Sequence, residues 1–500
     1  MKVLVANRGE IAVRILRTCR ELGFPSVSVY SEADQESLHT RYADESVSIG
    51  ATLASESYLN IDRVLQAAID SKVEAIHPGY GFLSENAVFA QAVEDAGLIF
   101  IGPLPETLAL TGDKLAARHI AREVGLPVLP GPDEAVIDEI PASLPKIVTY
   151  PVLIKAVSGG GGRGIRLANN SAELEAMVQA ARQEAMASFG DDNVYFEPLV
   201  QQARHVEIQI LGDGFGRILV LGERECSIQR RHQKLIEESP APSLSPSIRK
   251  KLYEAALNLG KALNYRSLGT VEFLLDENGA FYFIEVNPRI QVEHPVTEMV
   301  TGVDLVSVQL RLADGQPFKY AQEDIVTRGS AIEARIIAED PENGFLPSTG
   351  DITYLKEAGG PGVRIDSAIY TGMHITSDYD SLIAKVIVWA DERQTTIRRL
   401  RRALSEFQIG GVPTDIDFLI QIIDSESFIQ GRANTTYLET FQPSPAEGDD
   451  ILEKDMALAA ALLEHQNRNQ PQSVQLNQSI NQWQYQAWKE QMRQMLIIKL

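Results

Sequence analysis

The stretch VEFLLDENGAFYFIEVNPRIQVEH, residues 271–294, contains two runs rich in β-branched and aromatic residues on either side of Asn278-Gly279. Asn-Gly between two such runs predicts a β-hairpin with a two-residue turn. In that register Glu272 lies directly opposite Glu285, where Cβ atoms are roughly 4.5–5.5 Å apart and like charges destabilise a sheet. The stretch therefore predicts an antiparallel sheet that carries two facing carboxylates.

A divalent cation held between Glu272 and Glu285 removes this repulsion, and a ligand set made only of oxygens suits Mg²⁺ shared with substrate phosphates. The alternative is that one glutamate is protonated, or that both side chains turn into water. If the strand continues past Pro288, the two-residue period places four more polar side chains on the same face: Asn287, Arg289, Gln291 and Glu293.

These four side chains predict a surface for an anion beside a metal. Arg289 is suited to hold a planar oxyanion in bidentate fashion. Glu293 is suited to act as a general base, provided that its environment raises its pKa.

The run SGGGGRG at 158–164 satisfies the pattern GxGxxG, but it does not open a helix. Residues 165–168 predict a second strand, and a helix begins only near Ser171. The glycines thus join two antiparallel strands as a flap that can bring N–H groups onto a triphosphate, with Lys155 on the first strand. The alternative is a plain surface hairpin, which the entropic penalty of four consecutive glycines disfavours.

Two shorter motifs add polar groups. In RHVEIQI, His205, Glu207 and Gln209 alternate with apolar residues, so they share one face of a strand. RRHQK at 230–234 gathers Arg230, Arg231, His232 and Lys234; such a cluster alone is usually solvated, but beside the flap and the carboxylates it predicts a clamp for triphosphate and oxyanion.

The first hundred residues alternate strand and helix patterns, which predicts βαβ units on a parallel sheet. Ligands of such a sheet bind in loops after the strands, here NRGE at 7–10 and HPGYGFLSEN at 77–86. A second unit opens near Thr111, and the turn at 212–216 indicates antiparallel hairpins after Val200. The expected strands and helices span 3–6, 11–22, 27–30, 58–70, 75–77, 88–96 and 98–101.

Composition limits the partners. The 500 residues have a net charge of −22, which argues against nucleic acid and anionic membranes as partners. Two cysteines, Cys19 and Cys226, cannot make a disulfide framework, so a reducing compartment is expected. The N-terminus shows no signal or transit pattern, and the apolar run 456–463 is far shorter than the ~18 residues of a membrane span. A cytoplasmic protein without a membrane contact is expected.

Taken together, NRGEIAVRIL, HPGYGFLSEN, GGGGRG, RHVEIQ, CSIQRRHQK and EVNPRIQVEHPVTEM closely resemble biotin carboxylase, the ATP-grasp component of acyl-CoA and pyruvate carboxylases. The resemblance runs from Met1 to about residue 440. It implies an α/β plus α+β architecture: a Rossmann-like subdomain at 1–112, an ATP-grasp domain at 113–328 with a mobile lid at about 130–200, a C-terminal antiparallel β subdomain at 329–442, and a linker with a helical tail at 443–500.

The resemblance also implies roles for single residues. ATP would be bound by Lys114, Lys155, Gly161, Gly162, Glu197, Val200, His205, Gln229 and His232. Divalent ions would be bound by Glu272, Glu285 and Asn287, and bicarbonate by Lys234, Arg289, Gln291 and Val292. Glu293 would deprotonate bicarbonate, Arg335 would stabilise the biotin enolate, and Tyr80 and Asp380 would lie near biotin. Arg289, Glu293, Arg335 and Lys234 are thus the expected catalytic residues.

The implied cofactors are ATP, Mg²⁺ or Mn²⁺, and bicarbonate, with biotin as a substrate on a separate carrier protein. No alanine-methionine-lysine-methionine sequence for biotinylation occurs, and 500 residues leave no room for a transferase. The expected partners are a biotin carboxyl carrier protein, a second copy of the chain and a carboxyltransferase subunit. The reaction would be the first half-reaction of an acetyl-CoA or acyl-CoA carboxylase, as in fatty acid biosynthesis; the alternative is the corresponding component of a two-subunit pyruvate carboxylase.

One position departs from the family pattern. Pro198 stands after Glu197, where the family often has a lysine, and this puts nucleotide affinity in doubt. Three other functions stay open: another ATP-grasp ligase, which would lack Arg335 and the IQVEH strand; a nicotinamide oxidoreductase; and an inactive regulatory module. The tail, with a helical pattern at 451–465 and with Trp483 and Trp488, either docks as a helix or is a loosely held extension.

Overall fold

The computed structural model describes residues 1–131, 149–157, 164–443, 458 and 461–462. The chain divides into a unit of Met1–Pro443 and a second unit of Ser444–Leu500. In the second unit, the described residues Leu458, Ala461 and Leu462 are helical and exposed. The expected glycine flap and most of the expected tail helix, with Trp483 and Trp488, lie outside the described residues.

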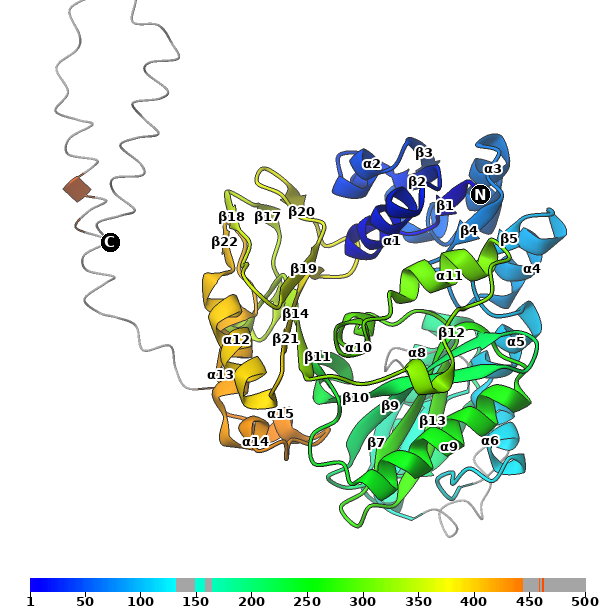
Figure 1. Cartoon of the computed structure of the whole chain (residues 1–500). Coiled ribbons are helices and arrows are strands. Elements are labelled where there is room, and N and C mark those ends of the chain that lie inside the picture. Colours follow the sequence, from blue (N-terminus) through cyan, green and yellow to red (C-terminus); the bar gives the residue numbers. More distant parts are fainter. Residues whose placement is uncertain (132–148, 158–163, 444–457, 459–460, 463–500) are drawn as a thin grey trace, which may run out of the picture. The chain divides into compact units, whose positions relative to one another are not determined.

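The N-terminal part is a five-stranded parallel sheet in the order β3-β2-β1-β4-β5 (Figure 1). Its elements are β1 (Val3–Val5), α1 (Gly9–Leu22), β2 (Ser26–Ser31), α2 (Leu38–Tyr42), β3 (Glu45–Gly50), α3 (Ile61–Asp70), β4 (Ala75–His77), α4 (Ala87–Asp95), β5 (Ile99–Phe100), α5 (Pro105–Gly112) and α6 (Lys114–Glu123).

The parallel sheet confirms the βαβ prediction, and β4 has the predicted bounds. The sequence pattern missed α2 and β3, a strand whose side chains are mostly exposed. The helix predicted at 58–70 begins instead at Ile61, because the Asn60 side chain caps it by accepting the Arg63 N–H. The predicted ligand loops meet after β1 and β4, where Asn7 donates to the carbonyls of Pro78 and Tyr80 at 2.7 Å each.

The central part begins with a separate three-stranded sheet in the order β7-β6-β8. The strand that follows the glycine run and the helix at Ser171 are both present, so the flap is not a Rossmann turn. The elements are β6 (Val152–Ala156), β7 (Ile165–Ala168), α8 (Ser171–Phe189), β8 (Val194–Pro198), β9 (Arg204–Asp213), β10 (Ile218–Arg230), β11 (Gln233–Ser239), α9 (Pro246–Ala262), β12 (Arg266–Leu275), β13 (Phe281–Asn287), α10 (His294–Thr301) and α11 (Leu305–Ala313).

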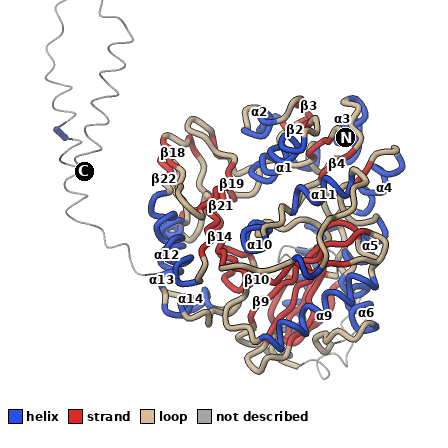
Figure 2. The backbone as a smooth tube through the Cα atoms, viewed as in Figure 1, coloured by secondary structure: helices blue, strands red, loops and turns tan. Residues whose placement is uncertain are grey.

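The last part continues the sheet of the central part rather than forming one of its own. A single eight-stranded antiparallel sheet runs in the order β13-β12-β9-β10-β11-β14-β21-β19, so it crosses the boundary expected at 328 (Figure 2). The elements are β14 (Ser330–Ile337), β15 (Glu339–Asp340), β16 (Leu346–Pro347), β17 (Gly350–Asp351), β18 (Tyr354–Lys356), β19 (Val363–Ser367), β20 (His374–Ile375), β21 (Leu382–Ala390), α12 (Arg393–Glu406), β22 (Gln408–Gly410), α13 (Ile416–Asp424), α14 (Glu426–Ile429) and α15 (Tyr437–Thr440).

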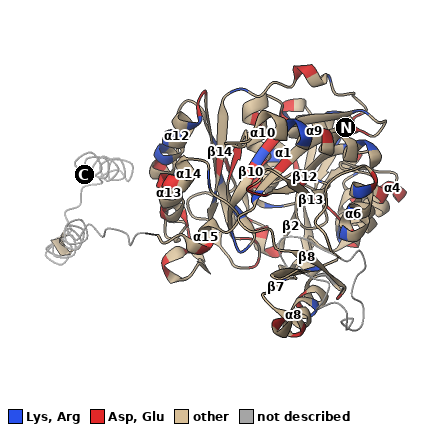
Figure 3. Cartoon of the chain, turned by 90° about the horizontal axis from the view of Figure 1, so that it is seen from below, with Lys and Arg blue, Asp and Glu red and all other residues tan. Residues whose placement is uncertain are grey.

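One face of this long sheet is apolar, as the alternation in RHVEIQI predicts. Val206, Ile208 and Ile210 pack in a core together with α6 and α9, so the intervening polar side chains of β9 face the opposite side. Both cysteines are buried thiols. No described helix is long and apolar enough to cross a bilayer. Acidic and basic residues are interspersed over the described surface (Figure 3).

Candidate active site on the long sheet

Three carboxylates and one guanidinium lie side by side across four neighbouring strands. Glu285 of β13 is opposite Glu272 of β12, Glu272 is opposite Glu207 of β9, and Glu207 is opposite Arg224 of β10. Glu207 and Arg224 are fully buried, and Nε of Arg224 donates to Oε1 of Glu207 at 2.5 Å. The predicted opposition of Glu272 and Glu285 is confirmed, and it extends into a longer row.

The predicted turn of this hairpin is wrong. The N–H of Asp276 donates to the carbonyl of Ala280 at 2.8 Å, so the loop holds three residues, and the pairs beside it are shifted by one. A β-bulge at Ile284 inserts an extra residue into β13 and shifts the register back before Glu285. Two shifts that cancel therefore produce the predicted pair.

Lys234 neutralises much of the carboxylate row. Its Nζ donates to Glu207 at 2.6 Å, to Glu272 at 3.0 Å and to Glu293 at 2.7 Å. Burial opposes the charge, but these three carboxylates hold the pKa of Lys234 well above its usual value. Burial likewise opposes ionisation of Glu272, but Lys234 and His205 hold its pKa below the usual range.

Glu293 lies at the centre of the site, although not on a strand. β13 ends at Asn287, because Pro288 has no N–H for the ladder, so the predicted continuation of the strand is wrong. Oε2 of Glu293 accepts from Arg335 at 3.0 Å, and the residue is fully buried. The condition of a raised pKa is also wrong: burial raises it, but Lys234 and Arg335 outweigh burial and lower it. The carboxylate is thus held in its ionised, proton-accepting form.

The other polar residues of this loop still converge. Arg289 donates to Asn287 Oδ1 at 3.2 Å, to Gln291 Oε1 at 3.0 Å and to Glu85 Oε1 at 2.5 Å. Gln291 is 4 % exposed, and its Nε2 has no hydrogen-bond partner among the described residues. A buried amide donor without a partner beside a guanidinium is suited to bind an anion.

A buried ion triad joins β6, β8 and α6. Nζ of Lys155 donates to Oε2 of Glu197 at 2.5 Å, and Arg118 donates to Oε1 of the same carboxylate. Burial raises the pKa of Glu197, but Lys155 and Arg118 lower it below its usual value. Arg118 also donates to the Leu129 carbonyl at 2.8 Å. The triad therefore fixes β6 and β8 of the small sheet against α6.

His205 connects the carboxylate row to the neighbouring strand β10. Its Nε2 lies 2.9 Å from Oε2 of Glu272, and its Nδ1 lies 2.7 Å from Nε2 of Gln229. Burial lowers the pKa of His205, but the charge of Glu272 outweighs burial and raises it. His232 lies in the exposed β10–β11 turn, and Val200 follows β8 half-buried. Gly161 and Gly162 lie outside the described residues.

The basic cluster at 230–234 does not form one clamp. Arg230 pairs with Glu339 and lies over the Phe345 ring, 4.0 Å from its centroid, whereas Lys234 reaches the carboxylate row. Arg231 is exposed. A strand alternates its side chains between two faces, so neighbouring basic residues separate.

Tyr80, Arg335 and Asp380 lie near one another, since both charged groups act on the Tyr80 hydroxyl: Asp380 raises its pKa and Arg335 lowers it, beyond the larger effect of burial. The hydroxyl itself donates to Glu10. Asp380 is exposed and accepts the N–H of Leu382 at 2.7 Å. Arg335 donates from Nε to Glu237 at 2.7 Å.

The oxygen donors fit a divalent cation. Glu272, Glu285 and Asn287 offer carboxylate and amide oxygens, and the Glu285 carboxylate has no hydrogen bond among the described residues; its nearest cation is Lys114 at 3.8 Å. Two tighter groups also occur in the described part of the chain. His205, Glu207 and Glu272 form one, and Glu207, Cys226 and Glu293 form the other.

Sequence reasoning missed the charged groups that hold the site residues in place: Glu10, Glu85, Arg118, Arg224 and Glu237. The available signal was charge inside strands with an apolar pattern, as in LGEREC at 221–226 and KLIEES at 234–239. Charged residues are rarely fully buried unless they are paired, so such strands indicate a buried ionic network.

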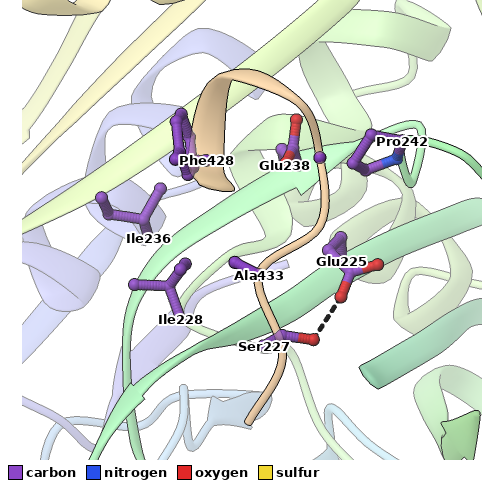
Figure 4. A pocket seen from close by; sticks show the side chains of 9 residues that line it. Glu225, Ser227, Ile228, Ile236, Glu238, Pro242, Phe428 and Ala433 are labelled. Atoms are coloured by element: carbon purple, nitrogen blue, oxygen red, sulfur yellow. Dashed lines mark hydrogen bonds between the residues drawn. The ribbon is translucent and has the colours of Figure 1, made fainter. Parts of the chain in front are cut away.

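A small cavity between β10, β11 and α14 does not belong to this site (Figure 4). Its volume is about 10 Å³, which is room for one water molecule. The Ser227 hydroxyl on its wall already donates to Glu225. The cavity is therefore too small for a substrate.

Comparison with known families matches nearly the whole described body. "Biotin carboxylase, N-terminal domain" matches residues 1–108, "Carbamoyl-phosphate synthase L chain, ATP binding domain" matches 113–321, and "Biotin carboxylase C-terminal domain" matches 333–440.

Curated relatives resemble the chain over most of its length. "Biotin carboxylase 1, chloroplastic" of Populus trichocarpa is 49 % identical over 452 residues, which are 90 % of this chain and 86 % of the relative. Biotin carboxylase of Nostoc sp. is 49 % identical over 439 residues, 88 % and 98 % of the two chains. One pyruvate carboxylase subunit, from Methanothermobacter thermautotrophicus, is 46 % identical over 463 residues, 92 % and 94 %.

Solved structures share the fold. A Campylobacter jejuni biotin carboxylase, in a "beta-gamma-ATP complex", superposes with a TM-score of 0.85 at 45 % identity, covering 88 % of this chain and 98 % of that one. The biotin carboxylase domain dimer of Hydrogenobacter thermophilus 2-oxoglutarate carboxylase, with MgADP, ADP and bicarbonate, also has a TM-score of 0.85 at 45 % identity, covering 88 % and 97 %.

Proposed function

The chain belongs to the biotin carboxylase family, and we propose that its site activates bicarbonate with ATP and carboxylates the biotin of a separate carrier protein. The observation that carries the proposal is the position of Glu293. Its two carboxylate oxygens lie against Lys234 at 2.7 Å and Arg335 at 3.0 Å. A buried, ionised acceptor between two cations suits a proton transfer that must take place beside developing negative charge.

The nucleotide side of the site consists of Lys114, Lys155, Gly161, Gly162, Glu197, Val200, His205, Gln229 and His232. In the proposal, the two lysines face the phosphates, and Glu197 to Val200 face the adenine. Mg²⁺ or Mn²⁺ would be held by Glu272, Glu285 and Asn287, and when bound it would supply positive charge against the phosphate oxygens.

Bicarbonate would lie against Arg289, Gln291, Val292 and Lys234. The free Nε2 of Gln291 supports this placement, since it offers a donor to an anion. Glu293 would take the bicarbonate proton, and the freed oxygen would attack the γ-phosphorus of ATP, giving carboxyphosphate and ADP. Phosphoryl transfer needs positioning and charge stabilisation, which these cations provide.

In the second step carboxyphosphate would break down to CO₂ and phosphate, and phosphate would take the ureido proton of biotin. Arg335 would stabilise the enolate that results, and the enolate would capture CO₂. Tyr80 and Asp380 would line the biotin side. Arg335 suits this role because Glu237 and Glu293 fix its guanidinium from two directions.

Bicarbonate-dependent ATP hydrolysis, measured with and without free biotin, tests the proposal. We expect bicarbonate to be required and free biotin to raise the rate and to become carboxylated. Glu293→Gln, which cannot accept the proton, is expected to lower the rate at least 100-fold. Activation by bicarbonate with no effect of biotin would instead indicate another ATP-grasp ligase.

The partners of the proposed reaction are a biotinyl carrier protein, a second copy of the chain and a carboxyltransferase subunit, in the cytoplasm. The transferase would select the acceptor, acetyl-CoA in the first instance. Pyruvate is the second candidate, since the pyruvate carboxylase relative is 46 % identical. Identifying the transferase that co-purifies with the native protein distinguishes the two. Deletion of 451–500, a segment mostly outside the described residues, is expected to weaken this complex and leave carboxylation of free biotin intact.

A further inference from the structure

Lys385 is a fully buried cation that the proposed reaction does not use. It lies in β21, opposite Arg335 of β14 on one side and Asp366 of β19 on the other. Removing an ammonium from water is costly unless it is paired and hydrogen-bonded. Its contacts therefore indicate why it is there.

The Nζ atom of Lys385 contacts three separate segments. It donates to the Val292 carbonyl at 2.9 Å, lies 3.1 Å from Oε1 of Glu10, and lies 3.9 Å from Oδ2 of Asp366. Glu10 belongs to the first turn of α1. One ammonium thus joins the N-terminal part, the loop after β13 and the last strands of the long sheet.

The contact with Val292 bears directly on the site. Residues 288–293 lie between β13 and α10 without forming a strand or a helix, so side-chain contacts must fix the path of this loop. Val292 directly precedes Glu293 and follows Gln291, the residues assigned to the proton and to the anion. A shift of its carbonyl would move both side chains.

The contact with Glu10 extends to the biotin side. Oε1 of Glu10 accepts the Tyr80 hydroxyl, and the other oxygen, Oε2, has no hydrogen-bond partner in the described part of the chain. Lys385 is the cation that Glu10 contacts. By contrast, Asp366 is held by two bonds from Arg364, at 2.9 and 2.7 Å. Glu10 therefore depends on Lys385, whereas Asp366 does not.

We propose that Lys385 is a positioning residue, which fixes the bicarbonate loop through the Val292 carbonyl and couples it to Tyr80 through Glu10. This inference rests on the proposed function, since it assigns the loop to bicarbonate. Lys385 touches no reacting atom; it sets where Gln291 and Glu293 lie when bicarbonate binds.

Two variants separate positioning from folding. Lys385→Met removes the ammonium and leaves Glu10 buried and unpaired, so we expect a less stable protein. Lys385→Met combined with Glu10→Gln leaves no unpaired carboxylate there and is expected to regain stability in urea unfolding. Both variants leave the Val292 carbonyl without its donor. We expect both to raise the KM for bicarbonate at least about tenfold, with the Kd for Mg²⁺-ATP changed less than about twofold.

Lys385→Arg provides a variant that keeps the buried charge. The guanidinium is planar and larger than an ammonium, so it cannot repeat the single short bond to Val292. We expect stability near that of the unaltered chain and a KM for bicarbonate raised severalfold. An unchanged KM in Lys385→Arg and in the stable double variant would overturn the proposal. Absence of bicarbonate-dependent hydrolysis in the unaltered chain would overturn the proposed function itself.

Discussion

The ammonium of Lys234 lies 2.7 Å from the carboxylate of Glu293 and also reaches Glu207 at 2.6 Å and Glu272 at 3.0 Å. Lys234→Met removes the cation that these carboxylates share. We expect the free energy of unfolding to fall by about 3–5 kcal/mol, the range measured when one partner of a buried pair is removed. Urea unfolding measures this loss, and bicarbonate-dependent ATP hydrolysis is expected to fall at least 100-fold.

The control for Lys234→Met is Lys261→Met, an exposed lysine near the end of α9. It is expected to change stability by less than about 0.5 kcal/mol. A stable and active Lys234→Met protein would show that the carboxylates do not depend on this cation.

The opposed pair Glu272 and Glu285 gives a second prediction. Burial and the charge of Glu272 raise the pKa of Glu285, an effect that Lys114 partly offsets. Glu285→Gln removes the repulsion, so without Mg²⁺ we expect the free energy of unfolding to rise by up to about 1 kcal/mol. The variant also loses a carboxylate ligand, so the increase in Tm caused by Mg²⁺-ATP should shrink.

Glu277→Gln, in the exposed loop of the same hairpin, is the matched control and should change neither quantity. If Glu285→Gln lowered stability without Mg²⁺ and kept the full response to Mg²⁺-ATP, the carboxylate pair would not be a metal site.

The sequence allowed the parallel sheet, the antiparallel hairpins and most of the site strands to be predicted, because each follows from local periodicity and turn residues. The polar face of β9 is an example: His205, Glu207 and Gln209 alternate with core residues, and all three are buried on the side of the site. The period of two alone determines that arrangement.

Features that depend on contacts between distant segments could not be predicted. The bulge at Ile284 and the strand end at Asn287 depend on how β13 packs and not on its own pattern. Arg118 meets Glu197 only because α6 and the small sheet fold together. The lowered pKa of Glu293 likewise requires Lys234 and Arg335, which come from β11 and β14.

His39 gives a pH prediction, because it is fully buried and burial lowers its pKa from 6.5 to about 4. In the unfolded chain this imidazole takes up a proton below about pH 6.5, whereas in the folded chain it stays neutral down to about pH 4. Stability from this group is therefore complete above the unfolded pKa and falls as the pH drops through that window. Between about pH 7.5 and 5.5 the loss is about 1.4 kcal/mol.

His39→Gln keeps a donor for the Val29 carbonyl, which lies 3.1 Å from His39 Nε2, but it cannot titrate. Urea unfolding at the two pH values should show a loss smaller by about 1.4 kcal/mol than in the unaltered chain. The exposed His119, changed to Gln, should leave the pH dependence unchanged. An equal loss in His39→Gln and the unaltered chain would mean that His39 takes up a proton in the folded state.

Pro198 gives the last prediction, on nucleotide affinity. It lies in β8, which is an edge strand of the order β7-β6-β8, and an edge tolerates a residue without an N–H. Its side chain is half-buried, directly after Glu197, the carboxylate held by Lys155 and Arg118. Pro198→Lys adds an ammonium at this position and restores an N–H. We expect the Kd for Mg²⁺-ATP, measured by calorimetry, to fall roughly three- to tenfold, which corresponds to about 0.6–1.4 kcal/mol. Pro198→Ala restores the N–H without the charge, so it separates the two contributions and is expected to change the Kd by less than about twofold. Equal gains from both substitutions would show that the ring of Pro198, and not the missing charge, limits affinity. No gain from either would place this position outside the nucleotide site.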